Sequence, residues 1–150
     1  MSRSSRMLAT VGAVTAAVAV MLVTGAVAAK PAAPVIHEPF TAPQCSGRPG
    51  DRTTFQRLEC AQQEVLRTDN QINTISATVF SQLPDDAARH RFVVAARAWL
   101  SYRNADCNSR SDVFEGGTEA PVKYTQCVVA RDKTRLTDMR VFVSELTPSG

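Results

Sequence analysis

The chain has 150 residues and carries 17 lysines and arginines against 14 aspartates and glutamates, a net charge of +3. Two of the arginines lie in the first seven residues, so the remainder holds 15 basic against 14 acidic side chains. This balance argues against nucleic acid or an anionic membrane surface as the main partner.

The first 29 residues have the pattern of an export signal. Two arginines precede an uncharged stretch over residues 8–29, which closes with the small residues Ala-Val-Ala-Ala. We expect a signal peptide over residues 1–29, cut after Ala28 or Ala29, and a protein that is secreted or held in the cell envelope. The alternative is an uncleaved membrane anchor, because the uncharged stretch is about as long as a membrane span.

Two further features of this segment indicate the export route. No cysteine follows the small residues directly, which excludes a lipoprotein, and no Arg-Arg pair is present, which favours the general export route. Removal of the signal leaves about 120 residues, enough for one domain with a single core.

Four cysteines, Cys45, Cys60, Cys107 and Cys127, lie in the exported part. An even number in an oxidising compartment predicts two disulfides, and the spacings fit neither a zinc site nor a redox C-x-x-C motif. We favour local pairing, Cys45–Cys60 and Cys107–Cys127, in which each loop contributes roughly 3 kcal/mol. A hairpin turning near Pro84 would instead place Cys60 level with Cys107, so the long-range pairing stays open.

Residues 30–50 contain five prolines and no periodic apolar pattern, which predicts a linker or an extended arm. A helical domain is expected over residues 51–147. Its first helix begins near Thr53, where Thr53-x-x-Gln56 has the form of a capping box, and ends at Pro84.

The second helix is expected over residues 86–106, capped by Asp85 or Asp86. One face of it carries Phe92, Ala95, Ala96, Trp99 and Tyr102 or Arg103, which predicts core packing for the two large aromatic residues.

A loop follows over residues 108–119, and Thr118 is expected to cap the third helix, with Glu119 in its first turn. The short turn at Pro84 makes the first two helices antiparallel neighbours. The sequence therefore predicts an all-α, three-helix domain stapled by two disulfides.

No catalytic constellation is present, so no enzyme, cofactor or metal site is predicted. We expect His37 and His90 to be solvated. The charged residues expected to face inward are Asp69, Glu64, Arg103 and Arg135. Aligning the first two helices as a hairpin predicts the ion pair Glu64–Arg103. Packing the third helix with Cys127 level with Cys107 predicts a second pair, Asp69–Arg135, and both pairs are expected beside Trp99.

Several short motifs together resemble the LprI-like family of small exported bacterial proteins. The family's first helix carries Cys-Ala and then Asp-x-x-Leu-Asn, and this chain has Cys60-Ala61 and Asp69-Asn-Gln-Ile72-Asn73. The second helix of the family ends in Trp-x-x-Tyr-Arg-Asp-x-x-Cys. The matching segment here is Trp99-Leu-Ser-Tyr102-Arg103-Asn104-Ala-Asp-Cys107, and it is followed by Gly116-Gly117-Thr118, Pro121, Cys127 and Arg135.

The resemblance implies a helical, disulfide-bonded fold, and shorter relatives favour the local disulfide pairing. The matching residues are interpreted as structural framework: Asp69, Asn73, Trp99, Tyr102, Arg103, Gly116, Gly117 and Arg135. The chain departs from the family pattern at Ser76, where the family has tyrosine, and at Asp132, where it has threonine.

The family is named after a lysozyme inhibitor, which implies lysozyme or another envelope protein as the partner. A loop that binds the two carboxylates of a lysozyme cleft would be basic or rich in hydrogen-bond donors. The exposed candidate is the segment 108–124, with Arg110, Lys123 and Tyr124 as contacts. The alternative function is an envelope structural or binding module that does not inhibit lysozyme, because a shared fold does not secure a shared function.

Overall fold

The computed structural model describes residues 30–41 and 44–147, so the predicted signal peptide lies outside the described residues. The described part contains α1 (Thr54–Gln82), α2 (Asp86–Ser111), the short 3-10 helix η1 (Asp112–Phe114) and α3 (Ala120–Leu146), with no β-strand. The prediction of an all-α, three-helix domain is confirmed.

The starts of α1 and α2 follow the capping residues expected from the sequence. Thr53 caps α1 in a reciprocal capping box with Gln56. Asp85 caps α2, where its carboxylate accepts a hydrogen bond of 2.7 Å from the backbone N–H of Ala88.

The connection between α2 and α3 differs from its prediction. α2 continues to Ser111, past the expected end at 106, and η1 follows it directly. Thr118 does not cap α3, because the residue before the helix is Glu119, whose backbone already has helical angles. The Glu119 side chain instead pairs with Arg57 at the start of α1.

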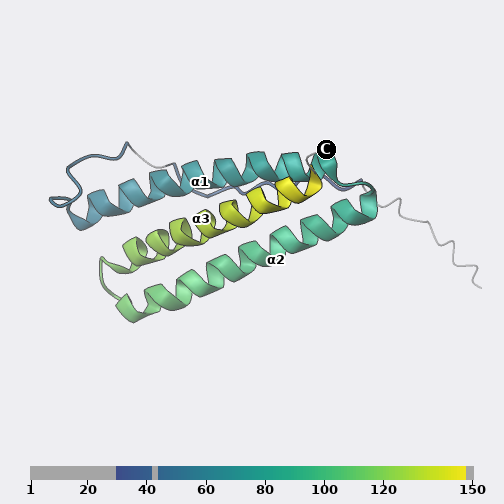
Figure 1. The fold of residues 1–150 in the computed structure, drawn as a ribbon. Helices are drawn as coiled ribbons and strands as arrows, with labels where there is room; N and C mark the ends of the chain where they lie inside the picture. The colour runs from purple at the N-terminus through teal and green to yellow at the C-terminus, as the bar shows by residue number, and fades with distance from the viewer. Residues whose placement is uncertain (1–29, 42–43, 148–150) are drawn as a thin grey trace, which may run out of the picture.

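The three helices pack so that α3 lies between α1 and α2 and contacts both of them (Figure 1). Near the Pro84 turn, Val79, Leu83, Phe92 and Met139 form one buried cluster, and at the other end Val65, Cys107 and Val128 form a second. The hairpin alignment assumed direct pairing of α1 and α2 along their lengths. With α3 inserted between them, that register no longer applies.

Two disulfides close the loops that local pairing predicted. Cys45 is bonded to Cys60, 15 residues apart, and Cys107 to Cys127, 20 residues apart. The long-range alternative is thereby excluded. Cys107 is fully buried, so the second disulfide is also part of the core.

Residues 30–41, here named the arm, run in an extended conformation beside α1 and α2. Asn73 of α1 binds the backbone of Ile36 twice: its Oδ1 accepts from the Ile36 N–H at 2.7 Å, and its Nδ2 donates to the Ile36 carbonyl at 3.0 Å. Phe40 packs against the buried cluster that contains Val65 and Cys107. The arm is therefore fixed to the helices by both polar and apolar contacts.

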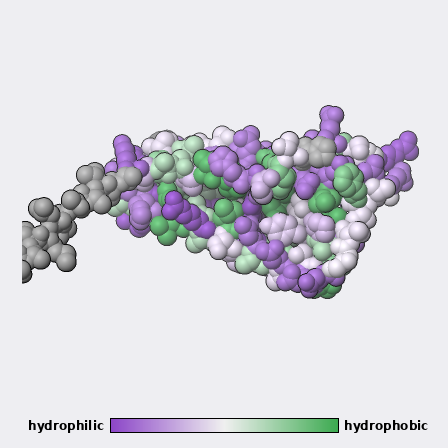
Figure 2. Space-filling view, turned by 180° about the vertical axis from the view of Figure 1, so that it is seen from behind, coloured by the Kyte–Doolittle hydropathy of each residue, from purple (hydrophilic) through white to green (hydrophobic). Residues whose placement is uncertain are grey.

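The surface mixes hydrophobic and hydrophilic residues over the face shown in Figure 2. Within the described residues, no helix combines the length and apolar character that a membrane span requires.

Candidate functional site

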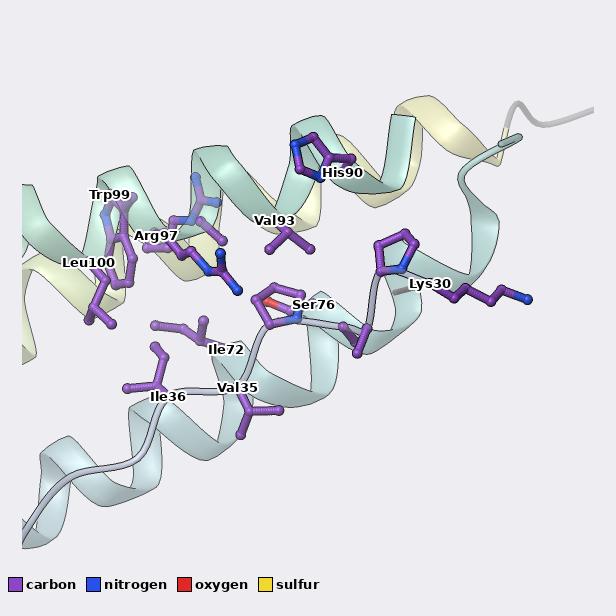
Figure 3. A pocket seen from close by; sticks show the side chains of 16 residues that line it. Lys30, Val35, Ile36, Ile72, Ser76, His90, Val93, Arg97, Trp99 and Leu100 are labelled. Atoms are coloured by element: carbon purple, nitrogen blue, oxygen red, sulfur yellow. The ribbon is translucent and has the colours of Figure 1, made fainter. Parts of the chain in front are cut away.

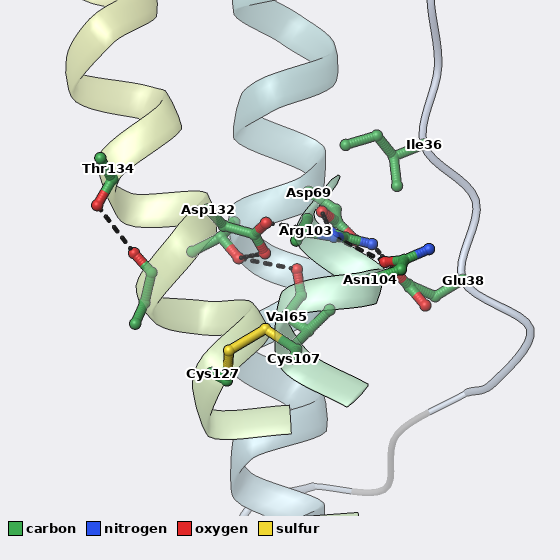
Figure 4. A network of polar contacts seen from close by, with 12 residues as sticks. Ile36, Glu38, Val65, Asp69, Arg103, Asn104, Cys107, Cys127, Asp132 and Thr134 are labelled. Atoms are coloured by element: carbon green, nitrogen blue, oxygen red, sulfur yellow. Dashed lines mark hydrogen bonds and ion pairs between the residues drawn. A yellow bond between two sulfur atoms is a disulfide. The ribbon is translucent and has the colours of Figure 1, made fainter. Parts of the chain in front are cut away.

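The most buried polar cluster of the described chain is centred on Arg103 of α2, which is 2% exposed. Its Nη1 donates to Asp69 of α1 at 2.8 Å and to Asp132 of α3 at 3.0 Å, and its Nη2 donates to Glu38 of the arm at 2.7 Å. Thr68 adds a hydrogen bond of 3.0 Å to Asp132. One guanidinium thus joins three helices to the arm (Figure 4).

The cluster holds three carboxylates around a single cation, and its electrostatics reflect this excess. Burial, followed by the charge of Asp132, raises the pKa of Asp69 to about 7. Burial also raises the pKa of Asp132, although Arg103 opposes the shift. One oxygen of Asp69, Oδ2, is buried without a hydrogen-bond partner among the described residues.

The predicted ion pairs Glu64–Arg103 and Asp69–Arg135 are wrong, although Asp69 and Arg103 are buried as expected. Glu64 pairs with Arg67 at 2.6 Å and with Lys133 at 3.0 Å. Arg135 lies over the Trp99 ring, 5.3 Å from its centroid. Arg103 pairs instead with Asp69 of α1, Asp132 of α3 and Glu38 of the arm, and the arm did not enter the alignment of the helices.

The second candidate region is the segment 108–124, here named the tip, which contains the end of α2, η1 and the first turns of α3. Val113 and Phe114 are exposed there, at 80% and 39%. Gly116 has a positive φ of 79°, and no heavy atom lies within 4 Å of a Cβ placed on it. The disulfide Cys107–Cys127 joins α2 to α3 where the tip begins.

The three predicted contact residues of the tip differ in accessibility. Arg110 is exposed and forms an ion pair of 3.1 Å with Asp106. The Lys123 ammonium lies 5.4 Å from the centroid of the Phe114 ring. Tyr124 is half-buried and packs against the cluster of Val65, Cys107 and Val128, so only part of its surface is free.

The third region is a cavity of about 430 Å³ between the arm and the helices. Figure 3 shows Ile72 and Ser76 of α1 on one side of it, and Val93 and Trp99 of α2 on the other. Residues 30–36 of the arm form a further wall. Trp99 was expected in the core, but it is half-buried and faces this cavity.

Asp106 lies beside the sulfurs of Cys107 and Cys127, a group whose residue types resemble a metal site. Both sulfurs are joined in a disulfide and offer no thiolate, so the group does not fit a metal ion.

A comparison with protein-family models decides the family. The model described as lysozyme inhibitor LprI matches residues 45–139, which covers all of α1 and α2 and much of α3. The chain belongs to the LprI lysozyme inhibitor family. Comparisons with curated proteins and with solved structures find no match.

The LprI match includes Arg103, Asp69 and Asp132 as well as the tip, but it begins after the arm. Glu38, Phe40 and the arm wall of the cavity are therefore outside the segment that the family model describes.

Most motif residues of the LprI pattern hold the interior together. Asp69 and Arg103 form the buried cluster, and Asn73 binds the arm. Three motif residues are exceptions. Tyr102 is 54% exposed and lies under the Arg131 guanidinium, and Gly116 and Gly117 are exposed in the tip.

The cavity was not predicted from the sequence. The departure at Ser76 was the available signal, because a small side chain replaces the tyrosine of the family pattern at a position that lines the cavity.

Proposed function

We propose that this protein is an exported, non-enzymatic inhibitor that binds lysozyme through the tip and blocks its cleft. The observation that carries the proposal is the pair of hydrophobic side chains on η1, Val113 and Phe114, which project from a turn braced by a disulfide. An exposed apolar pair on a braced turn loses little conformational freedom on binding, which favours affinity. Membership of the LprI family supports lysozyme as the target.

The charges of the tip suit a partner that is itself basic around an acidic cleft. In this proposal Arg110 and Lys123 approach the two catalytic carboxylates of a lysozyme. Asp112 and Glu115, both exposed, are placed to face the basic surface outside the cleft. Tyr124 contributes through the part of its ring that is not buried.

The experiment is a titration of lysozyme, acting on cell-wall substrate, with the exported and fully disulfide-bonded protein. We expect stoichiometric inhibition. Replacing Val113 and Phe114 with serine should weaken it at least roughly tenfold, as expected for central interface residues. The matched control is Val141→Ser on α3, an exposed valine at 54% that lies outside the tip.

A second set of variants separates the charged contacts from the apolar ones. Arg110→Ala combined with Lys123→Ala should raise the inhibitor concentration needed for half-maximal inhibition. Arg91 is an exposed arginine of α2, and Arg91→Ala should leave that concentration unchanged. If the intact protein inhibits and both tip variants inhibit equally well, the binding surface lies elsewhere.

A cell-envelope binding module without lysozyme inhibition is the second candidate. It is favoured by the position of the motif residues, since Asp69, Asn73 and Arg103 lie inside the domain and maintain the fold rather than a binding surface. Absence of inhibition by folded, fully bridged protein would select this function over the first.

A further inference from the structure

The cavity beneath the arm has an apolar lining formed by segments from three parts of the chain. Ile72 comes from α1, Val93 and Leu100 come from α2, and Val35 and Ile36 come from the arm. Its volume of about 430 Å³ lies within the range of small-molecule sites. Figure 3 shows Ile36, Ile72 and Val93 around the same space, whereas Val35 is 55% exposed at its edge.

The ionisable residues that line this cavity are all basic. They are Lys30, His90, Arg97 and Arg135, and no aspartate or glutamate is among the lining residues. Since the described chain as a whole is nearly balanced in charge, a lining whose ionisable residues are all basic is a local feature of the cavity.

Arg135 is the cation closest to the interior. It is half-buried, and its guanidinium lies over Trp99. Asp138 affects it only at longer range, and no carboxylate of the described residues forms an ion pair with it. A partly desolvated guanidinium without an anionic partner is a strong site for an incoming carboxylate, whose geometry it matches.

Ser76 supplies a second, independent indication. The residue is 4% exposed and lines the cavity, and its hydroxyl makes no hydrogen bond with any described residue. The hydroxyl is not among the buried polar atoms that lack a partner, so its oxygen borders the open space of the cavity and can bind a ligand.

We infer that the cavity binds an amphipathic anion of the fatty-acid class, with its hydrocarbon chain among the apolar residues and its carboxylate on Arg135 and Ser76. A neutral apolar ligand would leave both polar groups unpaired, which costs affinity. A small hydrophilic anion would leave the apolar walls uncovered. The inference concerns a site separate from the tip and does not depend on lysozyme binding.

The chain provides its own reporter for this site, because Trp99 is its single tryptophan and lines the cavity. The probe is ω-bromoundecanoate, used below its micelle concentration with the exported, disulfide-bonded protein, since bromine quenches tryptophan on contact. We expect saturable quenching of Trp99. The alcohol of the same chain, ω-bromoundecanol, should bind roughly tenfold more weakly because it lacks the charge that Arg135 pairs with.

Two variants test the assignment of the groups. Arg135→Gln should weaken binding of the acid roughly tenfold and leave binding of the alcohol almost unchanged. Arg140→Gln is the matched control, since this exposed arginine lies on the same helix and does not line the cavity. Ser76→Phe fills the cavity and should abolish quenching by both probes.

The inference is overturned if the acid does not quench Trp99, if acid and alcohol bind equally, or if Ser76→Phe binds both as the native protein does. Circular dichroism and a free-thiol assay establish that each variant is folded and bridged. If Arg135→Gln does not fold, Arg135→Lys, which keeps the positive charge, takes its place and should retain the preference for the acid.

Discussion

At the scale of single residues, the notable arrangement is one arginine among three carboxylates. Arg103 neutralises at most one of the charges of Glu38, Asp69 and Asp132, so the cluster favours an additional proton. The raised pKa of Asp69, about 7, identifies where that proton resides. A protonated Asp69 has an O–H to donate, and the neighbouring carboxylate of Glu38 can accept it.

This arrangement predicts that the free energy of unfolding falls as the pH rises from about 5 to 7. Below the folded pKa of about 7, native Asp69 holds a proton that the unfolded chain, with an ordinary pKa of 3.8, has already released. Deprotonating native Asp69 therefore costs stability, on the order of 2 kcal/mol over this interval. Urea unfolding at several pH values, with the disulfides intact, measures the effect.

The matched variant for this measurement is Asp69→Asn, which removes the titrating group and should flatten the pH dependence. Glu64, with its pKa lowered to about 2 by its hydrogen bond with Arg67, is ionised in both states over this interval and does not contribute. An Asp69→Asn variant that keeps the native slope would show that another group is responsible.

Sequence reasoning succeeded in part at this scale. Helical periodicity and the motif predicted that Asp69 and Arg103 face inward, because periodicity reports the face of a helix. It carries no information on the axial position of one helix against another, or on which segment fills the space between them. The partners Asp132 and Glu38 were therefore not predictable.

At the scale of elements, the arm is the segment that sequence patterns described least. Its prolines predicted an extended chain, but an extended segment without a repeating pattern gives no indication of where it docks. The structure shows that side chains of other elements define the docking site. Asn73 is the main one, because its amide makes hydrogen bonds with both the N–H and the carbonyl of Ile36, as the backbone of an adjacent strand would.

Asn73→Ala should therefore loosen the arm without unfolding the helices. Loss of two hydrogen bonds should speed amide exchange at Ile36 roughly tenfold or more, while amides in the middle of α1 keep their protection. Hydrogen–deuterium exchange measures both in one experiment. Asn70 is exposed on the same helix, so Asn70→Ala is the control and should exchange as the native protein does. Unchanged exchange at Ile36 in Asn73→Ala would mean that the contacts of Glu38 and Phe40 are sufficient to hold the arm.

At the scale of the whole molecule, the two disulfides contribute in different ways. Each closes a loop of similar size, so chain entropy assigns roughly 3 kcal/mol to both. Cys107 is fully buried in a core cluster, whereas Cys45 and Cys60 are only half-buried. The three-helix fold was predictable from the sequence, since helix caps, apolar periodicity and the number of cysteines all indicated it. The difference in stability between the two disulfides was not, because it depends on how each one packs.

We expect the paired change Cys107→Ala with Cys127→Ala to lower the free energy of unfolding by more than Cys45→Ala with Cys60→Ala, by on the order of 1 kcal/mol for the buried sulfur and its lost packing. Guanidinium unfolding of both double variants measures the difference. Equal losses would show that the core closes around the missing sulfur.

The arm precedes the segment that the LprI model matches, so relatives can differ in the arm while they share the matched helices. The disulfides, Arg103 and most of the helical residues lie within the shared segment, whereas residues 30–36 upstream of it complete one wall of the cavity. Substitutions or length changes in that short stretch alter the shape and charge of the cavity without disturbing a helix contact. Relatives can thus keep one helical frame and exchange only this wall, so that ligand preference evolves separately from folding stability.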